Sequence, residues 1–186
     1  MAAIISIFWQ ICLLKTGPDE LPGSNFLLGL VIVANALLSW SAFMVLQTIV
    51  PISSDAASQM SEAQLRALTD GWLLAVRVVV GLACTAAITW GLLSLMNHGQ
   101  RTNQTLSALY GSDLVLTLLT TTVFFLSQAA PEMVRQLANL GMFFWTVAVF
   151  GFVLHRALEI SMGFGIAAAL FLITFTFIVS QVAVNP

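Results

Sequence analysis

The stretch NFLLGLVIVANALLSWSAFMVLQTIV, residues 25–50, decides the class of fold, because it contains no charged residue. A helix needs about 20 predominantly apolar residues to cross the hydrocarbon core of a membrane, and this stretch is long enough. Pro51 follows it directly and cannot continue a regular helix. The sequence therefore predicts a transmembrane helix over residues 25–50.

The composition of the whole chain extends this prediction to the protein. Of its 186 residues, 59% are hydrophobic and 8% are charged, and the mean hydropathy is +0.98. A soluble domain carries about 25% charged residues, so the composition excludes a soluble enzyme and a disordered chain. A nucleic-acid binder needs a basic face, which six Lys and Arg residues do not provide. The net charge of -2 indicates neither an acidic nor a basic partner.

Further apolar runs predict an all-α, polytopic transmembrane helix bundle that forms a single domain over residues 1–186. The C-terminal apolar stretch is too long for one span, and we divide it at His155, Arg156 and Glu159. The N-terminal run is short, so the bundle has six spans, or five if this first helix lies at the membrane interface. The predicted spans are residues 2–14, 25–50, 72–96, 105–127, 140–154 and 161–184.

The basic residues of the loops predict the orientation of the bundle. Loops one, three and five hold Lys15, Arg101 and Arg156, while loops two and four hold Arg66 and Arg135, with Arg77 near them. The acidic residues lean to the second and fourth loops, which hold Asp55, Glu62, Asp70 and Glu132. Cytoplasmic loops carry an excess of Lys and Arg in membrane proteins. We therefore expect loops one, three and five in the cytoplasm of a bacterium whose inner membrane holds the chain.

Two ionisable residues, Arg77 and Asp113, lie deep inside predicted spans. Such groups are costly in a bilayer and are candidates for function. At a rise of 1.5 Å per residue, their Cα atoms differ in depth by roughly 15 Å. This difference argues against a direct ion pair, and Arg77 is expected to reach toward the nearer interface.

The predicted span over residues 105–127 carries a polar face. Tyr110, Asp113, Thr117 and Thr121 recur at steps of three and four residues, which places them on one side of a helix. This face suits either a cavity or proton path, or hydrogen bonds between neighbouring helices. The candidate intramembrane polar site consists of Arg77, Tyr110, Asp113, Thr117 and Thr121.

Other small and polar residues predict close helix packing. Asn35 and Ser39 share a face of the 25–50 span and suit one hydrogen bond to another helix. In the last span, small residues recur four positions apart, a spacing that lets helices approach closely. These candidate packing residues are Gly163, Gly165, Ala167 and Ala169.

No motif of a catalytic or metal-binding site occurs in the chain. HExxH, GxSxG, the P-loop and GxGxxG are all absent, and the carboxylates are scattered singly. Cys12 and Cys84 both lie in apolar runs, as packing residues do. We therefore expect a protein that is not an enzyme, with no catalytic, cofactor-binding or metal-binding residues.

Three segments of the chain resemble a known family. They are residues 104–111, the stretch from Trp145 to Ile160, and the Gly-Pro-x-x-Leu-Pro-small-Ser segment at residues 17–24. In these segments the chain resembles the Yip-domain family of small polytopic membrane proteins, and more closely a group of bacterial inner-membrane proteins. The resemblance implies five spans, a cytoplasmic N-terminal region and protein partners in membrane trafficking. This sequence lacks the family's soluble N-terminal domain, so we carry over the topology and not the trafficking role.

The sequence supports two functions, of which we expect the first and keep the second as the alternative. The first is a subunit or scaffold of a larger membrane complex, which acts through helix–helix contacts. The second is a small transporter or channel that uses the polar face of the span at residues 105–127. For the first, we expect as partners the lipid bilayer and a membrane protein or second copy, and no nucleic acid. Such a partner meets the chain within the bilayer or at the loop of residues 51–71.

Overall fold

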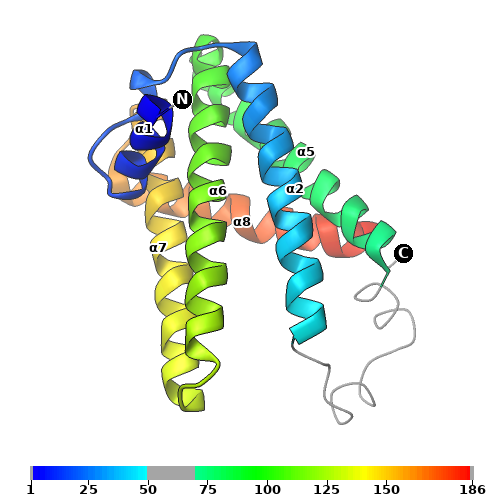
Figure 1. The fold of residues 1–186 in the computed structure, drawn as a ribbon. Coiled ribbons are helices and arrows are strands. Elements are labelled where there is room, and N and C mark those ends of the chain that lie inside the picture. Colours follow the sequence, from blue (N-terminus) through cyan, green and yellow to red (C-terminus); the bar gives the residue numbers. More distant parts are fainter. Residues whose placement is uncertain (1, 50–69, 185–186) are drawn as a thin grey trace.

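The computed structural model describes residues 2–49 and 70–184, and these residues form helices joined by turns, with no strand among them. This confirms the predicted all-α bundle (Figure 1). Most of the loop at residues 51–71, expected as a contact for partners, lies outside the described residues. The elements are α1 (Ala2–Cys12), η1 (Pro18–Glu20), α2 (Asn25–Ile49), α5 (Gly71–Leu95), η2 (Gly99–Arg101), α6 (Thr102–Ser127), α7 (Glu132–Leu158) and α8 (Met162–Val184).

Five of these helices, α2, α5, α6, α7 and α8, are long and apolar enough to cross a membrane. The chain is therefore a multi-pass integral membrane protein. The N-terminal helix α1 has 11 residues, and at 1.5 Å per residue it is too short for a hydrocarbon core of about 30 Å. The sequence predicted six spans, or five if the first helix lies at the interface. Among the described residues, five helices are able to span a membrane.

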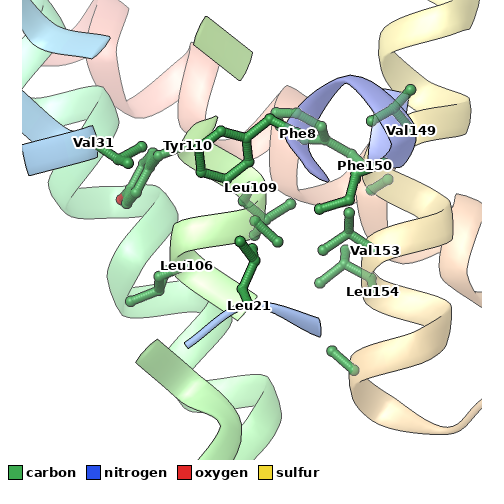
Figure 2. Close-up of a cluster of buried hydrophobic side chains, with 14 of the residues drawn as sticks. Phe8, Leu21, Val31, Leu106, Leu109, Tyr110, Val149, Phe150, Val153 and Leu154 are labelled. Atoms are coloured by element: carbon green, nitrogen blue, oxygen red, sulfur yellow. The ribbon is translucent and has the colours of Figure 1, made fainter. Parts of the chain in front are cut away.

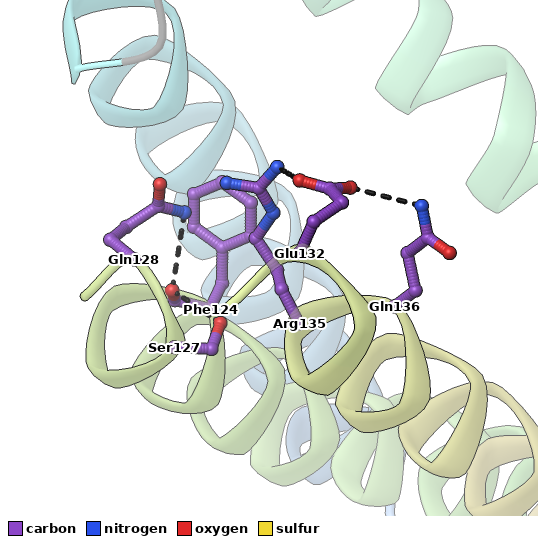
Figure 3. Close-up of polar contacts among 6 residues, drawn as sticks. All are labelled: Phe124, Ser127, Gln128, Glu132, Arg135 and Gln136. Atoms are coloured by element: carbon purple, nitrogen blue, oxygen red, sulfur yellow. Dashed lines mark hydrogen bonds and ion pairs between the residues drawn. The ribbon is translucent and has the colours of Figure 1, made fainter. Parts of the chain in front are cut away.

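The helix α7 begins earlier than the predicted span at residues 140–154. It starts at Glu132, directly after Pro131. Arg135 forms an ion pair with Glu132, and Gln136 Nε2 donates to Glu132 Oε1 at 3.0 Å (Figure 3). These contacts at spacings of three and four residues, with an acid at the positive end of the helix dipole, stabilise a polar first turn that a hydropathy criterion leaves out.

The helices are arranged around α6. In Figure 1, α7 runs beside α6 on one side and α2 lies on the other, while α5 runs diagonally to them. The last helix, α8, crosses behind α6 and α2 at a steep angle. It packs extensively against both α7 and α5. Thus α8 connects the two sides of the bundle.

Only one of the two small-residue pairs in α8 makes a close helix contact. Gly165 and Ala169 are buried, and a Cβ atom added to Gly165 would overlap the carbonyl oxygen of Gly151 in α7 and lie 2.9 Å from His155 Cβ. Gly163 and Ala167 are exposed, and a Cβ atom on Gly163 would meet nothing within 4 Å. Residues two positions apart point to different sides of a helix, so both pairs cannot face α7.

A buried apolar cluster joins α1 to the first half of α6 and to α7 (Figure 2). Phe8 and Ile11 of α1 are buried in it, and the Phe8 ring lies where any side chain at position 111 would project, so Gly111 allows this approach. Cys12 Sγ donates to the carbonyl oxygen of Ser112 at 3.7 Å, in keeping with a packing role. As a result, residues 105–112 of α6 are all buried.

Substitution of Gly165 tests the contact between α7 and α8. The Gly165→Ala substitution is expected to lower the free energy of unfolding by about 1–3 kcal/mol, because the added methyl group meets backbone atoms of α7 that cannot rotate away. The measurement is SDS-induced unfolding of the purified protein in mixed micelles. The matched control is Gly163→Ala, which should leave stability unchanged or slightly raised. Equal effects of the two substitutions would contradict the contact.

Candidate functional site

A cavity of about 550 Å³ lies between α2, α5, α6, α7 and α8. Its volume falls within the range of small-molecule sites, about 300–1,000 Å³. The structure brings all five residues of the candidate polar site to its wall, although they come from two helices. These residues are Arg77, Tyr110, Asp113, Thr117 and Thr121.

The carboxylate of Asp113 is bound by a residue of α2. Asn35 Nδ2 donates to Asp113 Oδ2 at 2.9 Å and to the carbonyl oxygen of Tyr110 at 3.0 Å. Ser39 Oγ in turn donates to Asn35 Oδ1 at 3.2 Å. Asn35 and Ser39, which the sequence suggested for helix packing, therefore do more than pack, because they position the acid on the cavity wall.

Tyr110 links α6 to two other helices. Its carbonyl oxygen accepts the hydrogen bond from Asn35 of α2, and its hydroxyl group donates to the carbonyl oxygen of Leu82 in α5 at 2.6 Å. A tyrosine hydroxyl group in an apolar bundle needs such a partner, since an unpaired polar group is costly there. Tyr110 thus fixes α2, α5 and α6 to one another at one level of the cavity.

Arg77 lies on the same cavity without an acidic partner among the described residues. The Cζ atom of its guanidinium group is 5.6 Å from the centre of the Phe43 ring in α2 and 5.7 Å from that of Phe177 in α8. Such cation–π contacts hold a cation in apolar surroundings. Arg77 and Asp113 form no ion pair, as their predicted difference in depth implied, yet they face one cavity.

Hydroxyl groups complete the polar part of the lining. Thr117, Thr120 and Thr121 contribute from α6, and the Oγ1 atoms of Thr85 in α5 and Thr176 in α8 lie 3.4 Å apart. The cavity therefore offers a carboxylate, a guanidinium group and several hydroxyl groups, which suits binding of a small polar solute. Among the described residues, no group of three or more His, Cys, Asp and Glu side chains could hold a metal ion.

Several residues of the cavity carried no signal in the sequence. Phe43 and Phe177 belong to apolar runs in which nothing distinguishes them from lipid-facing residues. The spacing of Asn35 and Ser39 indicated a shared face but not its partner, because a hydrogen bond across the bundle leaves no periodic pattern. Comparison with family models, with curated proteins and with solved structures gave no match to this chain.

The hydrogen bond between α2 and α6 can be tested by removing its donor. The Asn35→Leu substitution is expected to lower the free energy of unfolding by about 1–3 kcal/mol, because it leaves the Asp113 carboxylate and the Tyr110 carbonyl group without their partner. The measurement is again SDS-induced unfolding.

Asn103→Leu serves as the control for this substitution, because the Asn103 side chain donates to Asn25 Oδ1 in an exposed contact. It should change stability by less than about 0.5 kcal/mol. If Asn35→Leu proved no more harmful than this control, the Asn35–Asp113 hydrogen bond would not stabilise the bundle.

Proposed function

We propose that this integral membrane protein is a small transporter of polar solutes, in which Asp113 binds and releases the coupling proton. The observation that carries the proposal is the position of the Asp113 carboxylate on the wall of the cavity between the five apolar helices. Ionisable residues within membrane-spanning helices mark proton and solute paths in transporters.

The hydrogen bonding of the Asp113 carboxylate supports a role beyond helix packing. Only Asp113 Oδ2 accepts a hydrogen bond from Asn35, and no described residue donates to the second oxygen, Oδ1. Helices can be joined by Ser, Thr or Asn side chains alone, so a packing role does not require a carboxylate. An oxygen left without a donor beside a cavity can accept a proton or a cationic group of a solute.

Arg77 supports a solute that carries a negatively charged group. A guanidinium group in apolar surroundings needs an anion, and its planar donors match a carboxylate or phosphate group. No described carboxylate supplies that anion to Arg77. A bound solute would supply it, while the rings of Phe43 and Phe177 hold the guanidinium group in place.

The subunit or scaffold function is the second candidate, and one observation favours it. Gly163 and Ala167 lie four residues apart on an exposed face of α8, where no described residue covers them. Small residues at this spacing let a second helix approach closely in a membrane. The partner would be another membrane protein or a second copy of the chain.

For either function we place the chain in a bacterial inner membrane, with Lys15, Arg101 and Arg156 on the cytoplasmic side.

The transport function is tested in proteoliposomes that contain a trapped pH-sensitive dye. We impose an inside-negative potassium diffusion potential and add single amino acids, small organic acids or sugars outside. Wild-type protein should acidify the lumen on addition of its solute, and Asp113→Asn should slow this acidification by about tenfold or more, because the amide cannot take up a proton. Glu132→Gln, which removes an exposed acid at the start of α7, should behave as wild type.

Two results would contradict the transporter. The first is a rate of acidification that Asp113→Asn does not change, and the second is wild-type vesicles that respond to no solute. If, in addition, a membrane protein co-purified with the chain in fixed stoichiometry, and Gly163→Leu abolished its binding, the subunit function would replace the transporter.

A further inference from the structure

A second cavity, of about 400 Å³, lies at the N-terminal end of α6, where η1, the start of α6 and the end of α7 meet. It is separate from the cavity that contains Asp113, with which it shares no lining residue. Acidic and basic side chains both face it. They are Asp19, Arg101, His155, Arg156 and Glu159.

The wall that the N-terminal segment contributes is fixed in place. Gly17 and Pro18 are buried, and Leu21 is 1% exposed. Gln104 Nε2 of α6 donates to the carbonyl oxygen of Leu21 at 3.0 Å. This Gly-Pro-x-x-Leu-Pro segment therefore closes the cavity from one side, although it contributes nothing to the proposed transport site.

Three of the five side chains are engaged within the protein. Arg101 Nη1 forms an ion pair with Glu159 Oε1 at 2.7 Å, and His155 Nδ1 contacts the carbonyl oxygen of Ile160. Glu159 ends α7 with a φ angle of 56°, in the left-handed region that non-glycine residues seldom adopt. This backbone conformation reverses the chain between α7 and α8, and the Glu159 carboxylate lies against Arg101.

The other two charged side chains have no ionic partner among the described residues. The guanidinium group of Arg156 lies over the Phe152 ring, with its Cζ atom 5.6 Å from the ring centre, and it pairs with no described carboxylate. Asp19, on η1, forms no ion pair with a described residue either. The cavity thus presents one cation and one anion that form no ion pair with each other.

We propose that this cavity binds a zwitterion with a phosphate and an ammonium group, the chemistry of a phosphoethanolamine headgroup. The Arg156 guanidinium group binds the phosphate, and the Asp19 carboxylate binds the ammonium group. The cavity lies at the ends of membrane-spanning helices, where phospholipid headgroups are found. The proposal does not depend on the transport function.

Native mass spectrometry of the purified protein tests this site. The delipidated protein in detergent micelles is titrated with phosphatidylethanolamine and, separately, with phosphatidylglycerol, which has the phosphate group but no ammonium group. Phosphatidylethanolamine should bind at least about fivefold more tightly, because only it satisfies both charges. Asp19→Asn should remove this preference by weakening only phosphatidylethanolamine, whereas Arg156→Gln should weaken the binding of both lipids.

The controls are neighbours with the same charges, and each leaves the cavity lining intact. Glu20 lies beside Asp19 on η1, and Lys15 is a cation of the same loop. Neither residue lines the cavity, so Glu20→Gln and Lys15→Gln should both keep the wild-type preference. Elution as a single species in size-exclusion chromatography shows that each variant is folded. Arg156→Lys, which keeps the charge, should retain part of the binding.

A second titration, with soluble phosphoethanolamine, identifies the source of the zwitterion. Displacement of bound phosphatidylethanolamine only at high excess of phosphoethanolamine supports a lipid site. Binding of phosphoethanolamine without binding of the lipid supports the zwitterion site and assigns it to a soluble ligand. Equal affinity of the wild-type protein for the two lipids, wild-type preference in Asp19→Asn, or wild-type affinity for both lipids in Arg156→Gln would overturn the proposal.

Discussion

The structure depends on one constraint, the need to provide a partner for a carboxylate inside a bundle of apolar helices. A bilayer offers no hydrogen-bond donors, so the protein itself must supply them. Asn35 supplies one to Asp113 and, with the same amide group, one to the carbonyl oxygen of Tyr110. Because the Tyr110 hydroxyl group is bound to α5, Asn35 and Tyr110 together join α2, α5 and α6 at the level of this acid.

That level divides α6 into two halves with different surroundings. From residue 105 to residue 112 the helix is buried, and α1, too short to span, packs against this part through Phe8 (Figure 2). From Asp113 onward, Thr117, Thr120 and Thr121 face the cavity. The polar face therefore meets the cavity from Tyr110 onward, and mostly over the half of α6 that α1 does not cover. The cavity is closed toward the N-terminal end of α6 by packed side chains.

The helices and the polar face could be predicted from the sequence because both depend on local pattern. Charged residues such as Arg101 and Glu159 mark the ends of apolar runs, and Tyr110, Asp113, Thr117 and Thr121 repeat with the period of a helix. The partners of these residues could not be predicted, since Asn35 lies 78 positions from Asp113. For the same reason the sequence did not distinguish Gly165, which meets Gly151 of α7, from the exposed Gly163.

The hydrogen bond between Asn35 and Asp113 also explains how proton binding would act on the fold in the proposed transporter. A hydrogen bond to a charged acceptor contributes about 1.5–3 kcal/mol, and one between neutral groups about 0.5–1.5 kcal/mol. When Asp113 takes up a proton, the bond from Asn35 loses its charge and the contact between α2 and α6 weakens. Arg77 touches Phe43 of α2 and Phe177 of α8, so a shift of α2 changes both walls of the cavity. In the proposed transporter, binding of a proton at this carboxylate would thereby be coupled to the opening of the helices around it.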